Sequence, residues 1–318
     1  MEVAGAVKRY KLLAVMLAVT ALAAGCGQEE RSGRETQTEE TGGAGSSEQA
    51  GQTEPAEEAA DMTDGETVTN ALLPEELAQI PREYFEESDS PGTLVELTYD
   101  TYESMSYEEQ DQVLKKRAIV YLPYGYSEDE QYNVFYLMHG GGSNETTYLG
   151  TPERPNEFKN VLDNGIADGK IRPMIVVCPT YNNESESDSS GYSLALRLTE
   201  NYHNELLGDL IPAVEGTYST YAEDTTAEGI RASRDHRAFC GFSMGSVATW
   251  RTFQYCLDDF RYFLPSSGSL TADGEDGTFR YANNEKEGNL YFLEQEGGTH
   301  NGDYAMEYFY NGLCWIWQ

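Results

Sequence analysis

The clearest chemical motif of the chain lies at residues 240–245, with the sequence CGFSMG. It fits the pattern G-x-S-x-G of the nucleophile elbow, in which a serine occupies a sharp turn between a strand and a helix. We call this turn the elbow. The flanks agree, since residues 235–240 are typical of a short apolar strand and residues 246–260 of a helix with an apolar stripe. The pattern predicts that Ser243 is a nucleophile for carbonyl carbon, the alternative being an ordinary glycine-serine turn.

A second glycine motif, HGGG at residues 139–142, directly follows an apolar run at 132–138 that is typical of a buried strand. Backbone N–H groups of such a motif, with the N–H after the nucleophile, form the oxyanion hole of many serine hydrolases. The motif therefore predicts the amides of Gly141 and Met244 as the two donors. A glycine-rich turn without chemistry is the alternative, but both motifs in this order favour catalysis.

A serine nucleophile needs a base, and the chain has four histidines. His139 belongs to the glycine motif, His203 lies within a predicted helix, and His236 begins the strand before the elbow. His300 follows the last predicted strand and is the only histidine after Ser243. Because hydrolases of this kind place the triad in the order Ser, acid, His, the sequence predicts His300 as the base.

The elements that must position these residues alternate along the chain. Strands are predicted at residues 93–99, 116–122, 132–138, 174–178, 235–240, 261–265 and 289–294. Helices are predicted at residues 156–167, 194–215 (interrupted near Gly208 and Pro212), 246–260 and 303–317. Such alternation predicts an α/β fold, with a mostly parallel central sheet and helices on both faces.

Composition excludes some partners and cofactors. The 318 residues carry a formal net charge of -34, which would repel the phosphates of nucleic acid. The five cysteines form no C-x-x-C spacing, so neither a metal site nor a redox pair is expected, and no organic cofactor is implied. Four of them, Cys178, Cys240, Cys256 and Cys314, are expected to be free thiols rather than disulfides.

The N-terminus has the pattern of an export signal. Basic residues precede an apolar run at 12–24, and residues 22–26, LAAGC, resemble the lipobox of bacterial lipoproteins. We therefore expect residues 1–26 to be a lipoprotein signal peptide and Cys26 to become lipidated after cleavage. An ordinary signal peptide cut nearby, or an uncleaved anchor, is the alternative.

The composition of the segment that follows indicates a flexible linker. Residues 27–70 are rich in Glu, Gly, Ser and Thr and have almost no large apolar side chains, so they cannot bury a core. We expect a disordered acidic linker there and a folded domain at residues 71–318. The protein would then lie at the extracellular face of the membrane through its lipid, or be secreted.

From about residue 94 onward the chain resembles the esterase D / feruloyl esterase-like group of α/β hydrolases. The resemblance rests on residues 136–142 (YLMHGGG), 233–237 (SRDHR), 241–246 (GFSMGS), 297–300 (GGTH) and 308–313 (YFYNGL). It implies the α/β-hydrolase fold and hydrolysis of carboxyl esters, often acyl groups on plant cell-wall polysaccharide. It also implies Ser243 as nucleophile and His300 as base.

The chain departs from this group at the triad acid. The group has a further helix and strand before its final strand, and the acid follows that extra strand. Here only a short polar segment, residues 266–288, fills this interval, so the sheet is expected to be shortened between the nucleophile helix and the last strand. Asp273 and Asp276 could replace the acid from this segment, and Glu294 and Glu296 are weaker candidates.

The sequence thus supports three hypotheses. The first is a secreted serine carboxyl-ester hydrolase that removes feruloyl- or acetyl-type groups from polysaccharide, or cleaves small esters, through an acyl-enzyme. The second is a catalytically impaired surface protein of the same fold that binds carbohydrate, in which Tyr181 and Tyr192 could stack on sugar rings. The third is an acyltransferase of the same fold.

Overall fold

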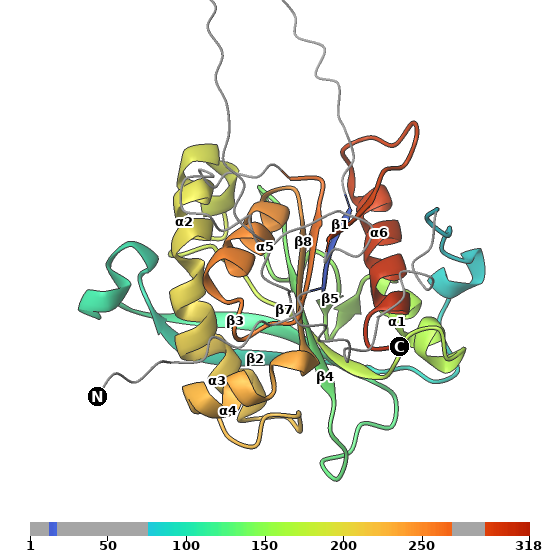
Figure 1. Ribbon diagram of the computed structural model, residues 1–318, viewed down its shortest axis with the longest axis horizontal. Coiled ribbons are helices and arrows are strands. Elements are labelled where there is room, and N and C mark those ends of the chain that lie inside the picture. The colour runs from blue at the N-terminus through green and yellow to red at the C-terminus, as the bar shows by residue number, and fades with distance from the viewer. Residues whose placement is uncertain (1–12, 18–75, 269–289) are drawn as a thin grey trace, which may run out of the picture. The chain divides into compact units, whose positions relative to one another are not determined.

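The computed structural model describes residues 13–17, 76–268 and 290–318 (Figure 1). Within these residues the central sheet has eight strands in the order β10-β1-β9-β8-β4-β7-β3-β2. The strands are β1 (Leu13–Leu17), β2 (Thr93–Tyr102), β3 (Val113–Leu122), β4 (Asn133–Met138), β7 (Met174–Cys178), β8 (Arg237–Phe242), β9 (Tyr262–Ser266) and β10 (Leu290–Leu293). The pairs β2-β3 and β3-β7 are antiparallel and the other described pairs of this sheet are parallel, so the predicted mostly parallel sheet is confirmed.

Helices cover both faces of this sheet, as predicted (Figure 1). The α-helices are α1 (Glu157–Ala167), α2 (Tyr192–Glu205), α3 (Ile211–Glu215), α4 (Ala227–Ala232), α5 (Met244–Tyr255) and α6 (Gly302–Trp315). Side chains of α2 and α5 belong to one apolar cluster, and those of α1 and α6 belong to a second cluster on the other face. A small hairpin, β5 (Gly150–Thr151) and β6 (Arg154–Pro155), precedes α1.

Strand β4 shows why its apolar run predicted burial on both sides. Val134, Tyr136 and Met138 contribute to the cluster under α2 and α5, whereas Phe135 and Leu137 contribute to the cluster under α1 and α6. Side chains alternate between the faces of a strand, so a strand covered on both faces needs apolar residues throughout. The glycine motif leaves the sheet directly after β4.

The long helical segment before the elbow strand differs from its predicted form. Between α2 and α3 the chain continues as a π-helical turn at Leu206–Leu210, so the expected interruption is a widened turn. Pro212 follows that turn as the second residue of α3, and proline disrupts the regular α-helical bonding of the turn before it. Helix α4 was not predicted from the sequence.

The start of the elbow strand is anchored by a buried ion pair. The guanidinium of Arg237, at the first position of β8, bonds to both carboxylate oxygens of Glu215 at the end of α3. Both side chains are 1% exposed. The same guanidinium donates to the carbonyl oxygens of Ile230 and Asp259. Removing either partner would leave a buried charge unpaired, so this pair holds β8 in place.

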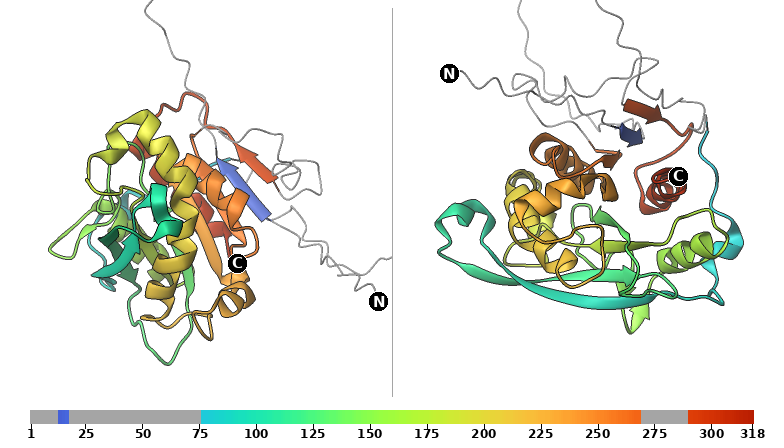
Figure 2. Two further views of the ribbon diagram at one scale, coloured as in Figure 1. Left: turned by 90° about the vertical axis from the view of Figure 1, so that its left-hand side faces the viewer. Right: turned by 60° about the horizontal axis from the view of Figure 1, so that its bottom comes forward.

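Strand β1 is the main surprise of the fold. Residues 13–17, within the predicted signal peptide, pair in parallel with both β9 and β10 (Figure 2). They occupy the interval in which the sequence lacks a strand, between β9 and β10. A short apolar run suits a sheet strand as well as a signal sequence, so periodicity alone does not separate the two. Cys26 and the linker 27–70 lie outside the described residues, and their assignments remain predictions.

Candidate active site

Ser243 occupies the turn between β8 and α5. Its backbone has φ 58° and ψ −117°, in a region that residues with a side chain seldom adopt. A side chain at Gly241 would collide with the carbonyl oxygen of Gly245, and one at Gly245 would collide with the carbonyl oxygen of Met138. The two glycines of the motif are therefore required by close backbone packing, which lets the turn present the Ser243 hydroxyl.

His300 lies beside this serine. It stands between β10 and α6, and its Nε2 is 2.9 Å from Ser243 Oγ. The imidazole ring packs against Phe242, with ring centroids 4.5 Å apart. Asn301 caps α6 by accepting a bond from the N–H of Tyr304, which helps to fix the turn that holds His300. His300 remains exposed, but neighbouring atoms partly desolvate its ring, which lowers its pKa and favours the neutral imidazole that can accept a proton.

The other three histidines lie where the sequence placed them and are engaged elsewhere. His203, in α2, stacks on Tyr255. His236 bonds to Asn133 and stacks on Tyr221 at the far end of β8. His139 is 1% exposed, beneath the glycine loop. The structure thus brings one histidine, His300, to the serine.

Desolvation by burial lowers the pKa of His300, and among the described residues no carboxylate contributes to that shift. Glu294 and Glu296 directly follow β10, and both are exposed. Asp273 and Asp276, the preferred candidates for the acid, lie outside the described residues. The described part of the site therefore contains a nucleophile and a base without an acid.

The glycine motif approaches the nucleophile closely. A Cβ at Gly140 would lie 3.3 Å from the carbonyl oxygen of Phe242 and 3.4 Å from Ser243 Cβ, so the loop passes close to the nucleophile. Met244 begins α5, where the backbone N–H has no partner within the helix and the helix dipole favours negative charge. Gly141, Met244 and Ser243 all border one cavity. Both residues of the predicted oxyanion hole therefore border the cavity at Ser243, and the role of their amides stays a prediction.

The cavity at Ser243 has a volume of about 470 Å³. It is lined by Gly141, Gly142, Ser189, Ser190, Tyr192, Ser243, Met244, Val247, Ser267 and Gly268. None of these residues carries a charge, and most of them are small. Sequence reasoning missed residues 189–190 and 267–268. A signal existed, because both segments follow parallel strands at their carboxyl ends, where α/β proteins bind ligands.

The two tyrosines that were expected to stack on sugar rings differ in their exposure to solvent. Tyr192 borders the cavity and is 64% exposed. Tyr181 is 0% exposed, and its ring stacks on that of His139 with centroids 4.6 Å apart. The expectation that Tyr181 could stack on sugar is therefore wrong, because its position after β7 directs it into the core.

The described residues contain no group of three or more His, Cys, Asp or Glu side chains placed to hold a metal ion. Cys178, Cys240, Cys256 and Cys314 are free thiols. Among the helices of the described residues, none has both the length and the apolar character needed to cross a bilayer.

Known proteins share this sequence and architecture. Residues 114–271 match the family model "Putative esterase". A mutant of the feruloyl esterase module from Clostridium thermocellum, complexed with sinapinate, is 31% identical, with a TM-score of 0.61 over 76% of this chain and 93% of that chain. The chain belongs to the feruloyl esterase-like family of α/β hydrolases.

Curated relatives of this feruloyl esterase-like chain are larger proteins. Endo-1,4-β-xylanase Y of Acetivibrio thermocellus is 36% identical over 245 residues, which cover 62% of this chain and 21% of the xylanase. An endo-1,4-β-xylanase/feruloyl esterase of Xylanibacter ruminicola is 36% identical over 140 residues, or 42% of this chain and 16% of that protein. The chain thus spans about a fifth or less of the length of the curated relatives it matches.

Proposed function

We propose that this chain is a serine carboxyl-ester hydrolase that releases feruloyl- or acetyl-type groups from polysaccharide. The observation that carries the proposal is the 2.9 Å contact between His300 Nε2 and Ser243 Oγ, beside two backbone amides and a cavity. The similarity to a feruloyl esterase module and to xylan-related enzymes supports the same reaction class.

The geometry supports acyl transfer through Ser243. Its Oγ attacks the ester carbonyl carbon while His300 Nε2 takes the hydroxyl proton. The carbonyl oxygen becomes an oxyanion and accepts hydrogen bonds from the amides of Gly141 and Met244. His300 then returns the proton to the leaving alcohol oxygen, and the C–O bond breaks to leave an acyl-enzyme.

Water completes the reaction. His300 removes a proton from a water molecule as its oxygen attacks the acyl carbon, and the same two amides again hold the oxyanion. Collapse of this second intermediate releases the carboxylic acid and restores the hydroxyl of Ser243 with the proton from His300. Every step uses side chains and amides of the chain itself.

The cavity suits an uncharged acyl group. Its lining carries no charge, and its volume of about 470 Å³ exceeds what an acetyl group alone would fill. Tyr192, exposed at its border, offers a ring face for an aromatic acyl group or a sugar. The related module was solved with sinapinate, an aromatic acid, which agrees with such a pocket.

The proposed hydrolase requires an acid that orients His300, and we assign this role to Asp276 or Asp273. A carboxylate at Nδ1 fixes the tautomer and stabilises the imidazolium that forms during attack; its loss lowers turnover by as much as ~10⁴ in serine proteases. Because the described residues provide no such carboxylate, a catalytically impaired protein that binds carbohydrate is the second candidate.

Hydrolysis assays separate the two candidates. The full chain and its Ser243→Ala and His300→Ala variants are assayed with 4-nitrophenyl acetate, methyl ferulate and feruloylated arabinoxylan. We expect hydrolysis by the wild type and near-complete loss in both variants. Equal rates in Ser243→Ala would contradict the serine mechanism. A wild type that hydrolyses none of these esters, yet is retained on arabinoxylan as strongly as Ser243→Ala, would favour the binding protein.

We also propose that the chain is displayed outside the cell through a lipid on Cys26, after a cleavage that removes the preceding residues and β1 with them. The N-terminal pattern supports the proposal, and a soluble linker of residues 27–70 would let the domain reach an insoluble polymer. In a bacterial host, the wild type should sediment with membranes and incorporate labelled palmitate, whereas Cys26→Ser should do neither. Membrane association of Cys26→Ser equal to that of the wild type would count against the anchor.

A further inference from the structure

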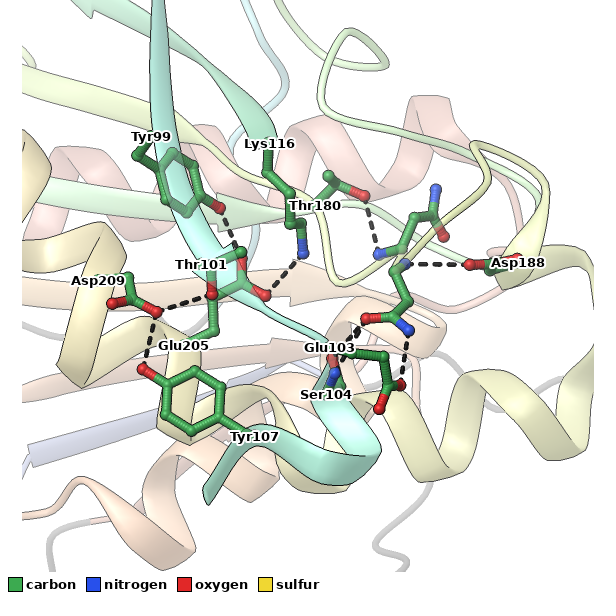
Figure 3. Close-up of polar contacts among 12 residues, drawn as sticks. Tyr99, Thr101, Glu103, Ser104, Tyr107, Lys116, Thr180, Asp188, Glu205 and Asp209 are labelled. Atoms are coloured by element: carbon green, nitrogen blue, oxygen red, sulfur yellow. Dashed lines mark hydrogen bonds and ion pairs between the residues drawn. The ribbon is translucent and has the colours of Figure 1, made fainter. Parts of the chain in front are cut away.

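The glycine motif at residues 139–142 packs against Thr180–Asn182, the segment that follows β7. Figure 3 shows Thr180 at one end of this segment and Asp188 farther along the same loop. Asp188 accepts bonds from the backbone N–H groups of residues 183–185. Its carboxylate therefore gives the loop a fixed shape before it reaches the cavity.

The carbonyl oxygen of Gly140 receives two hydrogen bonds in the core. One comes from the hydroxyl of Tyr181 at 3.2 Å, and the other from Nδ1 of His139 at 2.8 Å. Burial lowers the pKa of His139 to about 4, so its ring is neutral. A carbonyl oxygen can only accept, which places the His139 proton on Nδ1 and leaves Nε2 to accept from the Thr180 hydroxyl, 2.7 Å away.

These bonds set the direction of one peptide group. The Gly140–Gly141 peptide is trans, so its C=O and N–H point in opposite directions. Because the carbonyl oxygen of Gly140 points at Tyr181 and His139, the N–H of Gly141 must point the other way. Gly141 itself borders the cavity with Ser243, so an N–H directed away from the core can reach that cavity.

The far end of the motif is held as well. Asn182, which is 4% exposed, donates to the carbonyl oxygen of Ser143 and accepts from the N–H of Ser189. The N–H of Gly142 donates to the carbonyl oxygen of Ser189 at 3.0 Å. The amide of Gly142 is thus occupied, which leaves Gly141 as the donor of this loop that faces the cavity.

We propose that Tyr181 is a positioning residue for the oxyanion hole. Its hydroxyl holds the Gly140 carbonyl in the core and thereby aims the Gly141 N–H at the oxyanion formed on Ser243. This role rests on the proposed hydrolase function. It also explains why a tyrosine in a polar loop is completely buried against His139.

The variant Tyr181→Phe tests the role, because it removes one hydroxyl and keeps the ring that stacks on His139. Tyr121→Phe is the matched control, since Tyr121 is also 0% exposed and its hydroxyl donates to Asp163 at 2.8 Å. Loss of a whole oxyanion donor costs about 10²–10³ in kcat. His139 still holds the carbonyl, so we expect kcat for methyl ferulate to fall about 10-fold in Tyr181→Phe, with KM changed less than about twofold. Tyr121→Phe should keep kcat within about twofold at a similar loss of Tm.

A transition-state mimic separates positioning from general destabilisation. Phenylboronic acid forms a tetrahedral adduct with a serine hydroxyl, whereas ferulate binds as a planar product. In Tyr181→Phe, the inhibition constant of phenylboronic acid should rise by the same factor as kcat/KM falls, and that of ferulate should not change. Unchanged kcat and unchanged boronate inhibition in Tyr181→Phe would overturn the proposal.

If the wild type hydrolyses no ester and the proposed function fails, amide hydrogen exchange still tests whether Tyr181 holds the glycine motif. Amides of residues 139–143 should then exchange about 10-fold faster in Tyr181→Phe than in the wild type, because the loop has lost a fixed carbonyl. Tyr121→Phe should match the wild type in this segment. Equal protection of the segment in all three proteins would overturn the role of Tyr181 independently of any activity.

Discussion

The two halves of the site are built differently. The nucleophile half, with Ser243 and the glycine motif, stands on β8 and β4, which pair along five residues in the middle of the sheet. The base half, with His300, follows β10, whose described partner is β1 alone. Around the elbow, Phe242 and Ser243 are half-buried and their neighbours are buried, whereas His300 is exposed. The nucleophile half is therefore held by many close contacts, whereas the base half depends on a few.

The difference has a physical cause. The elbow is fixed by close backbone contacts, between Gly241 and Gly245 within the turn and between Gly245 and Met138 of β4. Its strand is anchored by the Arg237–Glu215 pair. His300 instead reaches Ser243 through a turn that follows a four-residue strand. The position of Ser243 is fixed by close packing in the middle of the sheet. The position of His300 depends on how β10 pairs with its neighbouring strand. Four experiments test whether the two halves of the site differ in this way.

The largest effect is expected from the acid. If Asp273 or Asp276 completes the base half, replacing both with Asn should lower kcat by up to ~10⁴, because the imidazolium loses its partner. The assay is methyl ferulate hydrolysis, with Glu223→Gln, at an exposed residue that is no candidate for the site, as the control that should leave kcat within about twofold. A double variant as active as the wild type would show that the base half works without either carboxylate.

The second effect contrasts a glycine in each half. In Gly245→Ala the new methyl group meets the backbone carbonyl of Met138, which cannot move without shifting β4, so we expect a loss of about 3 kcal/mol or more. Gly302 has open space around it at the start of α6, so Gly302→Ala should change the unfolding free energy by less than about 0.5 kcal/mol. Urea denaturation measures both. Comparable losses in the two variants would remove the contrast between the halves.

The third effect concerns β1. Deleting residues 1–26 removes the strand that pairs with β9 and β10, so the fragment 27–318 should be less stable than the full chain by roughly 2 kcal/mol. Its hydrolytic rate should fall as well, because β10 leads directly to His300. Thermal unfolding and kcat of the two proteins provide the comparison. Identical values would mean that the base half does not depend on residues 13–17.

The smallest effect is a shift in the pH profile. Burial lowers the pKa of His300, and only the neutral imidazole can accept the proton of Ser243. Without a carboxylate beside the ring, kcat/KM should therefore rise with pH with a midpoint below the ordinary histidine value of about 6.5. A carboxylate next to His300 would favour imidazolium and raise that midpoint. A midpoint well above 6.5 that drops in the Asp273/Asp276 variant would locate the acid in this segment.

Local sequence predicted much of this molecule. Apolar runs such as residues 174–178 became buried strands, because a strand covered on both faces must be apolar throughout. Resemblance to the esterase group placed Ser243 and His300 in one site, and the structure puts their side chains within hydrogen-bond distance. By contrast, the burial of Tyr181 and the shape of the loop that ends at Tyr192 followed from no local pattern.

The sequence alone was enough to predict the elbow, the glycine motif at residues 139–142, the chain order of serine and histidine, and the alternation of strands and helices. Each of these depends on sterics or periodicity within a few residues. Only the tertiary structure decided that Leu13–Leu17 lies between β9 and β10, and that Tyr181 contacts the carbonyl oxygen of Gly140. Those contacts join residues far apart in the chain, and they form only where the sheet brings two strand ends together.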